Sequence, residues 1–206
     1  MNFKDVDSCL GRLIGKGCSK KVYELKDDGS RVVLVTYAQY GILEEWGTLL
    51  WLEERGFPVM QIESVFQKHY DGDVYVLAER ASASRLNQEG VVFDLSVFNE
   101  KTLESIHNIR ALLQKHKCYM SDFQYLIKND GSLVISDPGD LCIITDSNDW
   151  QRSYGIMNTD LKKSEMAVAY SKHLRSQGQT VWAGSIWNFW AETEDYVRAR
   201  GSAEAA

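Results

Sequence analysis

The sequence predicts an α+β protein in two parts, residues 1–80 and residues 81–206. Three observations lead to this prediction. Short apolar segments rich in β-branched residues, separated by turns that contain Gly and Asp, fill most of the first part. One segment among them has helical periodicity. Beyond Glu79 the residues become small and polar, and the rest of the chain is mainly helical in pattern with a single hairpin.

Three strands are expected before the first helix. They cover Leu10–Ile14, Lys21–Leu25 and Arg31–Tyr37, and the last of them is a run of β-branched residues. Residues 15–17 (GKG) form the first turn. Residues 27–30 (DDGS) have the composition of a tight hairpin turn, so the second and third strands are expected to pair antiparallel.

The helix of the first part is expected at Ile42–Arg55, ending at Gly56. Its apolar residues recur with helical period: Leu43, Trp46, Leu49, Leu50 and Leu52. Strands at Val59–Phe66 and Val74–Ala78 follow, joined by a turn with the sequence YDGD. The first part is therefore expected to be a sheet of five antiparallel strands with one helix.

The second part is predicted to consist of helices and one hairpin. A polar linker at residues 81–87 leads to a helix at Leu103–His116. The hairpin strands Tyr125–Ile127 and Leu133–Ile135 flank a turn at residues 129–131 (NDG). The last elements are two helices and a frayed end: Asn158–Ser176 with Asn158 or Thr159 as N-cap, Trp182–Val197, and residues 201–206.

The composition limits the classes of function. A chain of 206 residues with 44% hydrophobic residues can bury a core, and a net charge of −6 argues against attraction to nucleic acid or anionic lipid. No apolar stretch approaches the roughly 20 residues that span a bilayer. The four cysteines are scattered and form no metal-binding or disulfide pattern. We therefore expect a cytoplasmic protein without nucleic-acid or membrane partners.

Two stretches carry residues suited to phosphate chemistry. Residues 15–23 (GKGCSKKVY) place glycines and lysines in a turn, where backbone N–H and ammonium groups can bind negatively charged oxygens. Residues 121–140 (SDFQYLIKNDGSLVISDPGD) form a hairpin with Asp122 before its first strand and Asp137 after its second. Each stretch also fits an ordinary hairpin, the first with solvated lysines and the second with surface acids.

These segments, in this order, resemble the protein kinase fold from about Leu10 to Asp140. A shortened catalytic loop and D-P in place of D-F-G are also found in compact bacterial and phage kinase-like proteins, which this sequence resembles most. The resemblance implies a minimal bilobal kinase-like fold, with a nucleotide-binding N-lobe at residues 1–80 and a reduced C-lobe at residues 81–206. It also implies an enzyme that uses ATP and Mg²⁺ and acts on a protein substrate.

Residues 15–23 resemble the kinase glycine-rich loop. The resemblance places Gly15, Gly17 and Ser19 at the phosphates of ATP and Val22 over the adenine. Lys20 stands where the third glycine is expected.

The third strand lacks the phosphate-binding lysine of kinases. Residues 33–36 (VLVT) match V-A-I-K, so Leu34 is expected at the nucleotide and Thr36 replaces the lysine. Because side chains alternate along a strand, Lys20 lies on the same face as Val22, toward the phosphates, and Lys21 points away. The arrangement resembles the with-no-lysine kinases, whose lysine comes from the glycine-rich loop.

A glutamate of the helix is expected to hold that lysine. Glu45 is the first candidate because Leu49 and Leu52, four and seven residues later, mark the inward side of the helix. Glu44 is the alternative, and a solvated acidic surface is the other interpretation of both.

The fifth strand and the residues after it, 74–82 (VYVLAERAS), resemble a kinase hinge. Ala78 takes the gatekeeper position. Backbone groups of Glu79 and Ala81 are then expected to meet the edge of the adenine.

Residues 137–139 (DPG) resemble D-F-G, which makes Asp137 an expected Mg²⁺ ligand. Counting back from Asp137, Gln124 matches the metal-binding asparagine of kinases, with one methylene more. Asp122 precedes it by two residues and is the expected base or orienting group for the substrate hydroxyl. The catalytic loop is therefore three residues shorter than in full-size kinases.

The sequence leaves several functions open. An active Ser/Thr protein kinase is favoured. Because only residues 141–206 follow and they contain no A-P-E motif, a constitutive configuration is expected. Thr36 and Gln124 also suit a nucleotide-binding pseudokinase, and the fold could phosphorylate a small molecule or transfer AMP. Since the first strand begins near Leu10, a bacterial or phage cytoplasmic protein is favoured over a type III effector, which would act in the host cytosol.

Overall fold

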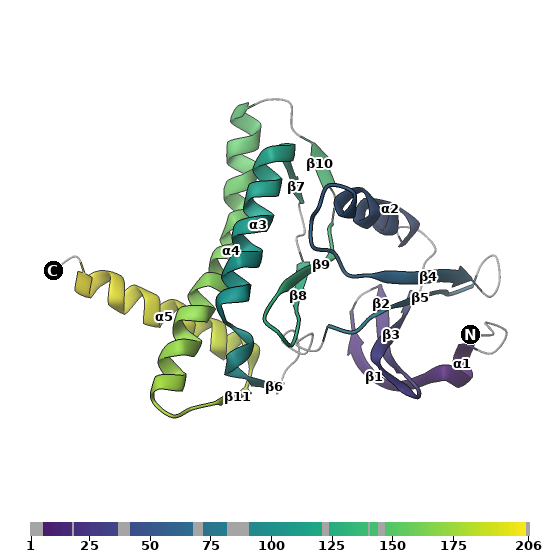
Figure 1. Cartoon of the computed structure of the whole chain (residues 1–206), viewed down its shortest axis with the longest axis horizontal. Helices are drawn as coiled ribbons and strands as arrows, with labels where there is room; N and C mark the ends of the chain where they lie inside the picture. The colour runs from purple at the N-terminus through teal and green to yellow at the C-terminus, as the bar shows by residue number, and fades with distance from the viewer. Residues whose placement is uncertain are drawn as a thin grey trace. The chain divides into compact units, whose positions relative to one another are not determined.

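Figure 1 shows the computed structural model of the chain, which describes residues 6–17, 19–36, 42–67, 72–81, 91–120, 124–139, 141–143 and 147–204. Two compact units divide the chain. Unit 1 comprises residues 1–54 and 59–81, and unit 2 comprises residues 55–58 and 82–206. A five-stranded antiparallel sheet in unit 1 and a mainly helical unit 2 confirm the predicted class, an α+β, minimal bilobal kinase-like fold.

The described part of unit 1 contains α1 Val6–Cys9, β1 Leu10–Lys16, β2 Lys20–Leu25, β3 Asp28–Thr36, α2 Ile42–Glu53, β4 Ile62–Gln67 and β5 Val74–Glu79. The strand order is β1-β2-β3-β5-β4, and each neighbouring pair is antiparallel. The prediction of three strands, one helix and two strands is confirmed, and α1 was not predicted.

The two faces of this sheet have different surroundings. Val33 and Val35 of β3 and Tyr75 and Leu77 of β5 form a buried cluster on one face, and Val6 of α1 packs into it. Since side chains alternate along a strand, the residues between these positions face the opposite side. That side includes the position where kinases carry their β3 lysine.

The described part of unit 2 contains β6 Val91–Asp94, a 3₁₀ turn Leu95–Val97, α3 Glu100–His116, β7 Cys118–Met120, β8 Gln124–Ile127, β9 Leu133–Asp137, β10 Leu141–Ile143, α4 Ser147–Ser176, β11 Val181–Gly184 and α5 Ile186–Glu204. The strands form three antiparallel pairs: β6 with β11, β7 with β10, and β8 with β9. Helices α3 and α4 run side by side (Figure 1). An ion pair between Arg110 and Glu165 joins them.

An aromatic cluster forms the core beside α5. Phe189 is fully buried, and its ring centroid lies 5.2 Å from those of Phe93 and Trp182 and 5.5 Å from that of Phe98. Phe93 and Trp182 come from the paired strands β6 and β11. The cluster therefore joins the paired strands β6 and β11 to α5.

Boundaries in unit 1 differ slightly from the prediction. The turn expected at residues 27–30 lies at Lys26 and Asp27, because Asp27 adopts the left-handed conformation (φ 65°), which Asp tolerates better than most residues. Asp28 already belongs to β3, where its carboxylate accepts hydrogen bonds from the Ser30 N–H and hydroxyl. α2 ends at Glu53 rather than at residue 55, and Gly56 follows with φ 82°.

Larger differences occur after residue 146. α4 begins at Ser147, well before the N-cap expected at residue 158 or 159, because Asn and Thr cost less than about 0.7 kcal/mol each inside a helix. The helix expected from Trp182 begins at Ile186, since Val181–Gly184 pairs with β6, a strand that was not predicted. α5 extends to Glu204, where fraying was expected. The predicted linker at residues 81–87 lies outside the described residues after Ala81.

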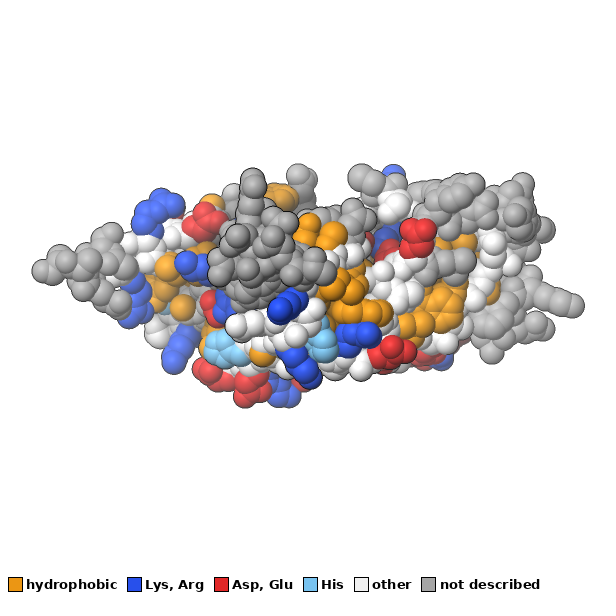
Figure 2. Space-filling model, turned by 90° about the horizontal axis from the view of Figure 1, so that it is seen from above, with side chains coloured by type: hydrophobic (Ala, Val, Ile, Leu, Met, Phe, Trp, Pro, Cys, Tyr) orange, Lys and Arg blue, Asp and Glu red, His pale blue; other side chains and the backbone are white. Residues whose placement is uncertain are grey.

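The surface is mixed in charge. Figure 2 shows acidic and basic side chains interspersed with apolar ones on the face in view. Among the residues that the structure describes, Val92, Ile143 and Trp187 are the most exposed large apolar ones. None of the helices in the described residues has the length and apolar character needed to cross a membrane.

Candidate active site

Lys20 and Glu45 form an ion pair within unit 1. Lys20 is the first residue of β2, and its Nζ lies 2.7 Å from both carboxylate oxygens of Glu45 on α2. The two side chains are only 19% and 15% exposed. Glu44, the alternative partner, is exposed. Of the residues predicted for this contact, the structure thus brings together Lys20 and Glu45.

The register of the sheet places Lys20 beside Thr36, the residue that stands where kinases carry their β3 lysine. Lys20 is the direct partner of Thr36 in the β2–β3 ladder, and Lys21 is the partner of Val35. Paired residues share a face of the sheet, so Lys20 and Thr36 point to one side and Lys21 to the other. Thr36 is buried, and its hydroxyl donates to the carbonyl of Val74. Lys20 therefore lies one strand away from the kinase lysine position at Thr36, on the same rung and the same face of the sheet.

The β1–β2 turn is closed by its own backbone. Gly15 pairs with Val22, and the Gly17 N–H donates to the Lys20 carbonyl at 2.8 Å. Ser19 is exposed. The backbone of Lys20 is thereby held at the turn while its side chain reaches α2.

The residues predicted around the adenine lie on the same sheet. Val22 is opposite Leu34 in the β2–β3 ladder, so both share the face of Lys20. Leu34 is buried, and Ala81 follows β5 and is buried as well. The Glu79 N–H donates to the Gln61 carbonyl at 3.0 Å. An adenine contact at Glu79 would accordingly use its carbonyl.

In unit 2, Gln124 and Asp137 are direct partners at the open end of the β8–β9 hairpin. The ladder pairs Tyr125 with Ile135 and then Gln124 with Asp137, so Ser136 is an extra residue that forms a bulge. A regular ladder would have paired Gln124 with Ser136. The bulge therefore places the two predicted metal ligands on one rung.

Two strand pairs enclose the predicted catalytic loop. Met120, before the loop, pairs with Leu141, and Gln124, after it, pairs with Asp137. The loop residues 121–123, which include Asp122, lie outside the described residues.

Asp137 begins a turn that a proline and a glycine complete. Its Oδ1 accepts a hydrogen bond from the Gly139 N–H at 3.3 Å, and Gly139 has φ 54°. Pro138 is buried. Among the described residues no cluster of three or more His, Cys, Asp or Glu side chains could hold a metal on its own. A cation at Asp137 would need further oxygen ligands, which a nucleotide phosphate provides.

Contacts that fix the hairpin were not predicted. The Tyr125 hydroxyl bonds to the fully buried Ser164 of α4, and the Ile135 N–H donates to the Pro58 carbonyl at 2.8 Å. Both partners are far away in the sequence, and neither pair has a local pattern that could reveal it.

A protein-family model described as the type III secretion system effector HopBF1 kinase domain matches residues 2–157. The chain belongs to this family. The matched range contains Lys20, Glu45 and the whole β8–β9 hairpin, and it ends within α4. A relative, the type III effector protein HopBF1 of Pseudomonas syringae pv. syringae (strain FF5), is 25% identical over 146 residues, which are 64% of this chain and 71% of that protein.

The family confirms the predicted resemblance to compact, atypical bacterial kinase-like proteins and implies a kinase-type activity. It also supports the alternative origin. The position of β1 near Leu10 had favoured a bacterial or phage cytoplasmic protein, whereas the family is one of type III effectors.

Proposed function

We propose that this protein is an ATP-dependent protein kinase that transfers the γ-phosphate of ATP to a Ser or Thr hydroxyl of another protein, with Mg²⁺. The observation that supports this most is the Lys20–Glu45 ion pair on the rung of Thr36. An ordinary hairpin with solvated lysines would not bury this pair. In this proposal unit 1 is the nucleotide-binding lobe and unit 2 is the reduced C-lobe that carries the catalytic hairpin.

Lys20 would neutralise the phosphates of ATP. Two bonds of 2.7 Å to Glu45 hold its ammonium in place, so little reorganisation is needed during the reaction. Gly15, Gly17 and Ser19 would approach the phosphates through the backbone of the turn.

The adenine would lie against the face of the sheet that carries Val22 and Leu34. The Glu79 carbonyl and the Ala81 backbone would bind its polar edge. Leu34 is larger than the alanine that kinases carry at this position. Its side chain would fill part of the adenine site and make that site shallower than in other kinases.

Gln124 and Asp137 suit a magnesium ion, because a carboxylate and an amide carbonyl on neighbouring positions are the oxygen donors that Mg²⁺ prefers. The ion would neutralise charge on the phosphates. Asp122 would accept the proton of the substrate hydroxyl while the hydroxyl oxygen forms a bond to the γ-phosphorus. The bond from that phosphorus to the ADP oxygen breaks in the same step, and ADP leaves.

The effector relationship indicates the setting of this reaction. Because the relative is a type III effector, we propose a host protein as the substrate and the host cytosol as the place of action. β10 begins only four residues after Asp137, so there is little room for a long activation segment there. The enzyme would be active without phosphorylation of such a segment.

The test is transfer of label from γ-labelled ATP with Mg²⁺ to the protein itself, to casein or to a host lysate. We expect label with the wild type and with Lys21→Ala, which serves as the matched control, and a loss of at least about 100-fold with Lys20→Ala or Asp137→Ala. An inactive wild type would overturn the kinase proposal.

Two further measurements separate the alternative functions. Label transferred from α-labelled ATP would indicate AMP transfer instead. A thermal shift with ATP and Mg²⁺ but no transfer would indicate a nucleotide-binding pseudokinase.

A further inference from the structure

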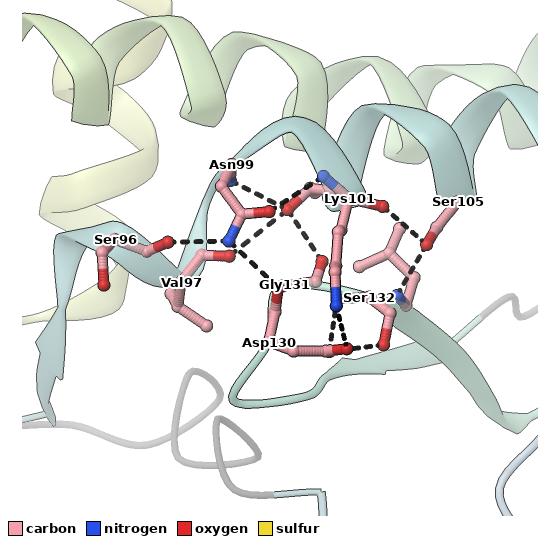
Figure 3. A network of polar contacts seen from close by, with 10 residues as sticks. Ser96, Val97, Asn99, Lys101, Ser105, Asp130, Gly131 and Ser132 are labelled. Carbon is pink, nitrogen blue, oxygen red and sulfur yellow. Dashed lines mark hydrogen bonds and ion pairs between the residues drawn. The ribbon is translucent and has the colours of Figure 1, made fainter.

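The turn of the β8–β9 hairpin is bound to the N-terminus of α3 by side chains that the proposed reaction does not use (Figure 3). Asn99, the N-cap of α3, donates from Nδ2 to the Asp130 carbonyl at 3.1 Å and accepts from the Lys101 N–H at 2.9 Å. The Lys101 ammonium lies 2.9 Å from the Asp130 carboxylate. That carboxylate also accepts from the N–H and the hydroxyl of Ser132.

The centre of this contact is buried. Thr102 is fully buried, and its hydroxyl accepts from the Asn99 N–H at 3.1 Å and donates to the Gly131 carbonyl at 2.8 Å. Gly131 has φ 92°, and a Cβ built on it would lie 2.4 Å from Asn99 Nδ2. A side chain at this position would push the turn away from the helix. We refer to the bonds of Asn99, Thr102, Asp130 and Gly131 as the α3–turn contact.

β9 is held along the edge that does not pair with β8. The Leu133 N–H donates to the Ser105 hydroxyl of α3 at 3.1 Å, and the Ile135 N–H donates to the Pro58 carbonyl. The turn and the first half of β9 are therefore fixed to α3 and to residue 58. Asp137 is the last residue of the same strand, four residues after Leu133 and about 13 Å from it at 3.3 Å per residue.

We propose that Thr102 and Asn99 are positioning residues for phosphoryl transfer. They fix the turn on α3, and through the short, stiff hairpin they fix the place of Asp137 and Gln124 at its other end. This inference rests on the proposed function. Since a displacement of about 1 Å can lower a rate up to 100-fold, a loosened turn should affect the chemical step more than ATP binding.

The test compares two buried threonines. Thr102→Val removes the hydroxyl of the α3–turn contact with little change in volume, and Thr102→Ser keeps the hydroxyl. Thr193→Val is the matched control, because Thr193 is also fully buried and its hydroxyl donates at 2.7 Å to the Phe189 carbonyl within α5.

We expect Thr102→Val to lower kcat about tenfold and to raise the Mg²⁺ concentration for half-maximal rate, with KM for ATP within about twofold of the wild type. Thr102→Ser should restore both values. Thr193→Val should lower the melting temperature without changing either kinetic value. A purely structural role of Thr102 would give the result of Thr193→Val, and that outcome would overturn the inference.

Asn99→Ser keeps the test decisive if Thr102→Val does not fold. Serine preserves the N-cap acceptor but removes the Nδ2 bond to the Asp130 carbonyl. We expect a loss in kcat of about threefold with an unchanged KM for ATP, and an unchanged kcat would overturn the inference. If the wild type is active and Thr102→Val and Asn99→Ser are equally active, only this inference is refuted. If the wild type is inactive, the proposed function is refuted and the inference with it.

Discussion

The relocated lysine leads to the sharpest prediction. Lys20→Met removes the ammonium and keeps most of the aliphatic stem, whereas Lys21→Met removes the neighbouring charge on the opposite face of the sheet. A third variant combines Lys20→Met with Thr36→Lys. The new lysine at position 36 would lie on β3, directly opposite position 20 of β2, and would return an ammonium group to the same rung.

The structure sets the expected size of the effects. At an effective dielectric constant of about 20, two charges about 3 Å apart attract by roughly 5–6 kcal/mol before desolvation is counted. Desolvation offsets most of this, and Lys20→Met leaves a mostly buried Glu45 without its partner. We therefore expect the free energy of unfolding to fall by about 1–3 kcal/mol with Lys20→Met, and by less than about 0.5 kcal/mol with Lys21→Met.

Two assays measure the outcome: urea unfolding, and label transfer from γ-labelled ATP at saturating Mg²⁺. We expect Lys20→Met to lose at least about 100-fold in rate, Lys21→Met to stay within about twofold, and the double variant to recover at least about tenfold over Lys20→Met. An active Lys20→Met, or an inactive Lys21→Met, would refute the assignment of the phosphate-binding lysine. A double variant with no recovery would refute the argument from the shared rung.

Three further predictions follow from individual side chains. Hydrogen bonds from Ser30 lower the pKa of Asp28 to about 2 from an ordinary 3.8, so the ionised carboxylate stabilises the fold fully above about pH 4 and loses this effect as the pH falls toward 2. In a plot of the free energy of unfolding against pH, Asp28→Asn should therefore flatten the decrease at acid pH, and an unchanged decrease would contradict the prediction. Burial raises the pKa of Cys118 to about 11, so mass-spectrometric mapping of maleimide adducts at pH 7.5 should find Cys9, which is partly exposed, modified much faster than Cys118. Leu52→Ala empties a fully buried site on α2 and should cost about 2–5 kcal/mol in urea unfolding, whereas a loss below about 1 kcal/mol would show that the site collapses.

Unit 1 was predictable because its signals are local. β-branched strands, a Gly- and Asp-rich turn and one periodic helix follow each other in the chain, and each described strand of the sheet pairs with the strand next to it in sequence. The β3–β5 pairing, across α2 and β4, joins the first three strands to the last two. The choice of Lys20 over Lys21 needed only strand alternation. The choice of Glu45 over Glu44 needed only the apolar side of α2.

Unit 2 was harder to predict because its decisive contacts join distant segments. β6 and β11 are four residues long and pair across α3 and α4, so Trp182 was assigned to a helix although it faces Phe93 from a strand. The early start of α4 was missed because a capping residue inside a helix costs little. Short strands have little periodicity to detect, and tertiary pairing decides whether they form.

Local sequence patterns were enough to predict the turn with Lys20, the glutamate of α2 that faces it, and a hairpin with an acid at each end. These follow from turn chemistry and periodicity, which act over a few residues. The sheet register that puts Thr36 on the rung of Lys20, and the bulge that brings Gln124 opposite Asp137, became visible only in the folded structure. Sheet register and the packing of helices on strands depend on contacts between segments far apart in the chain, and no local pattern encodes them.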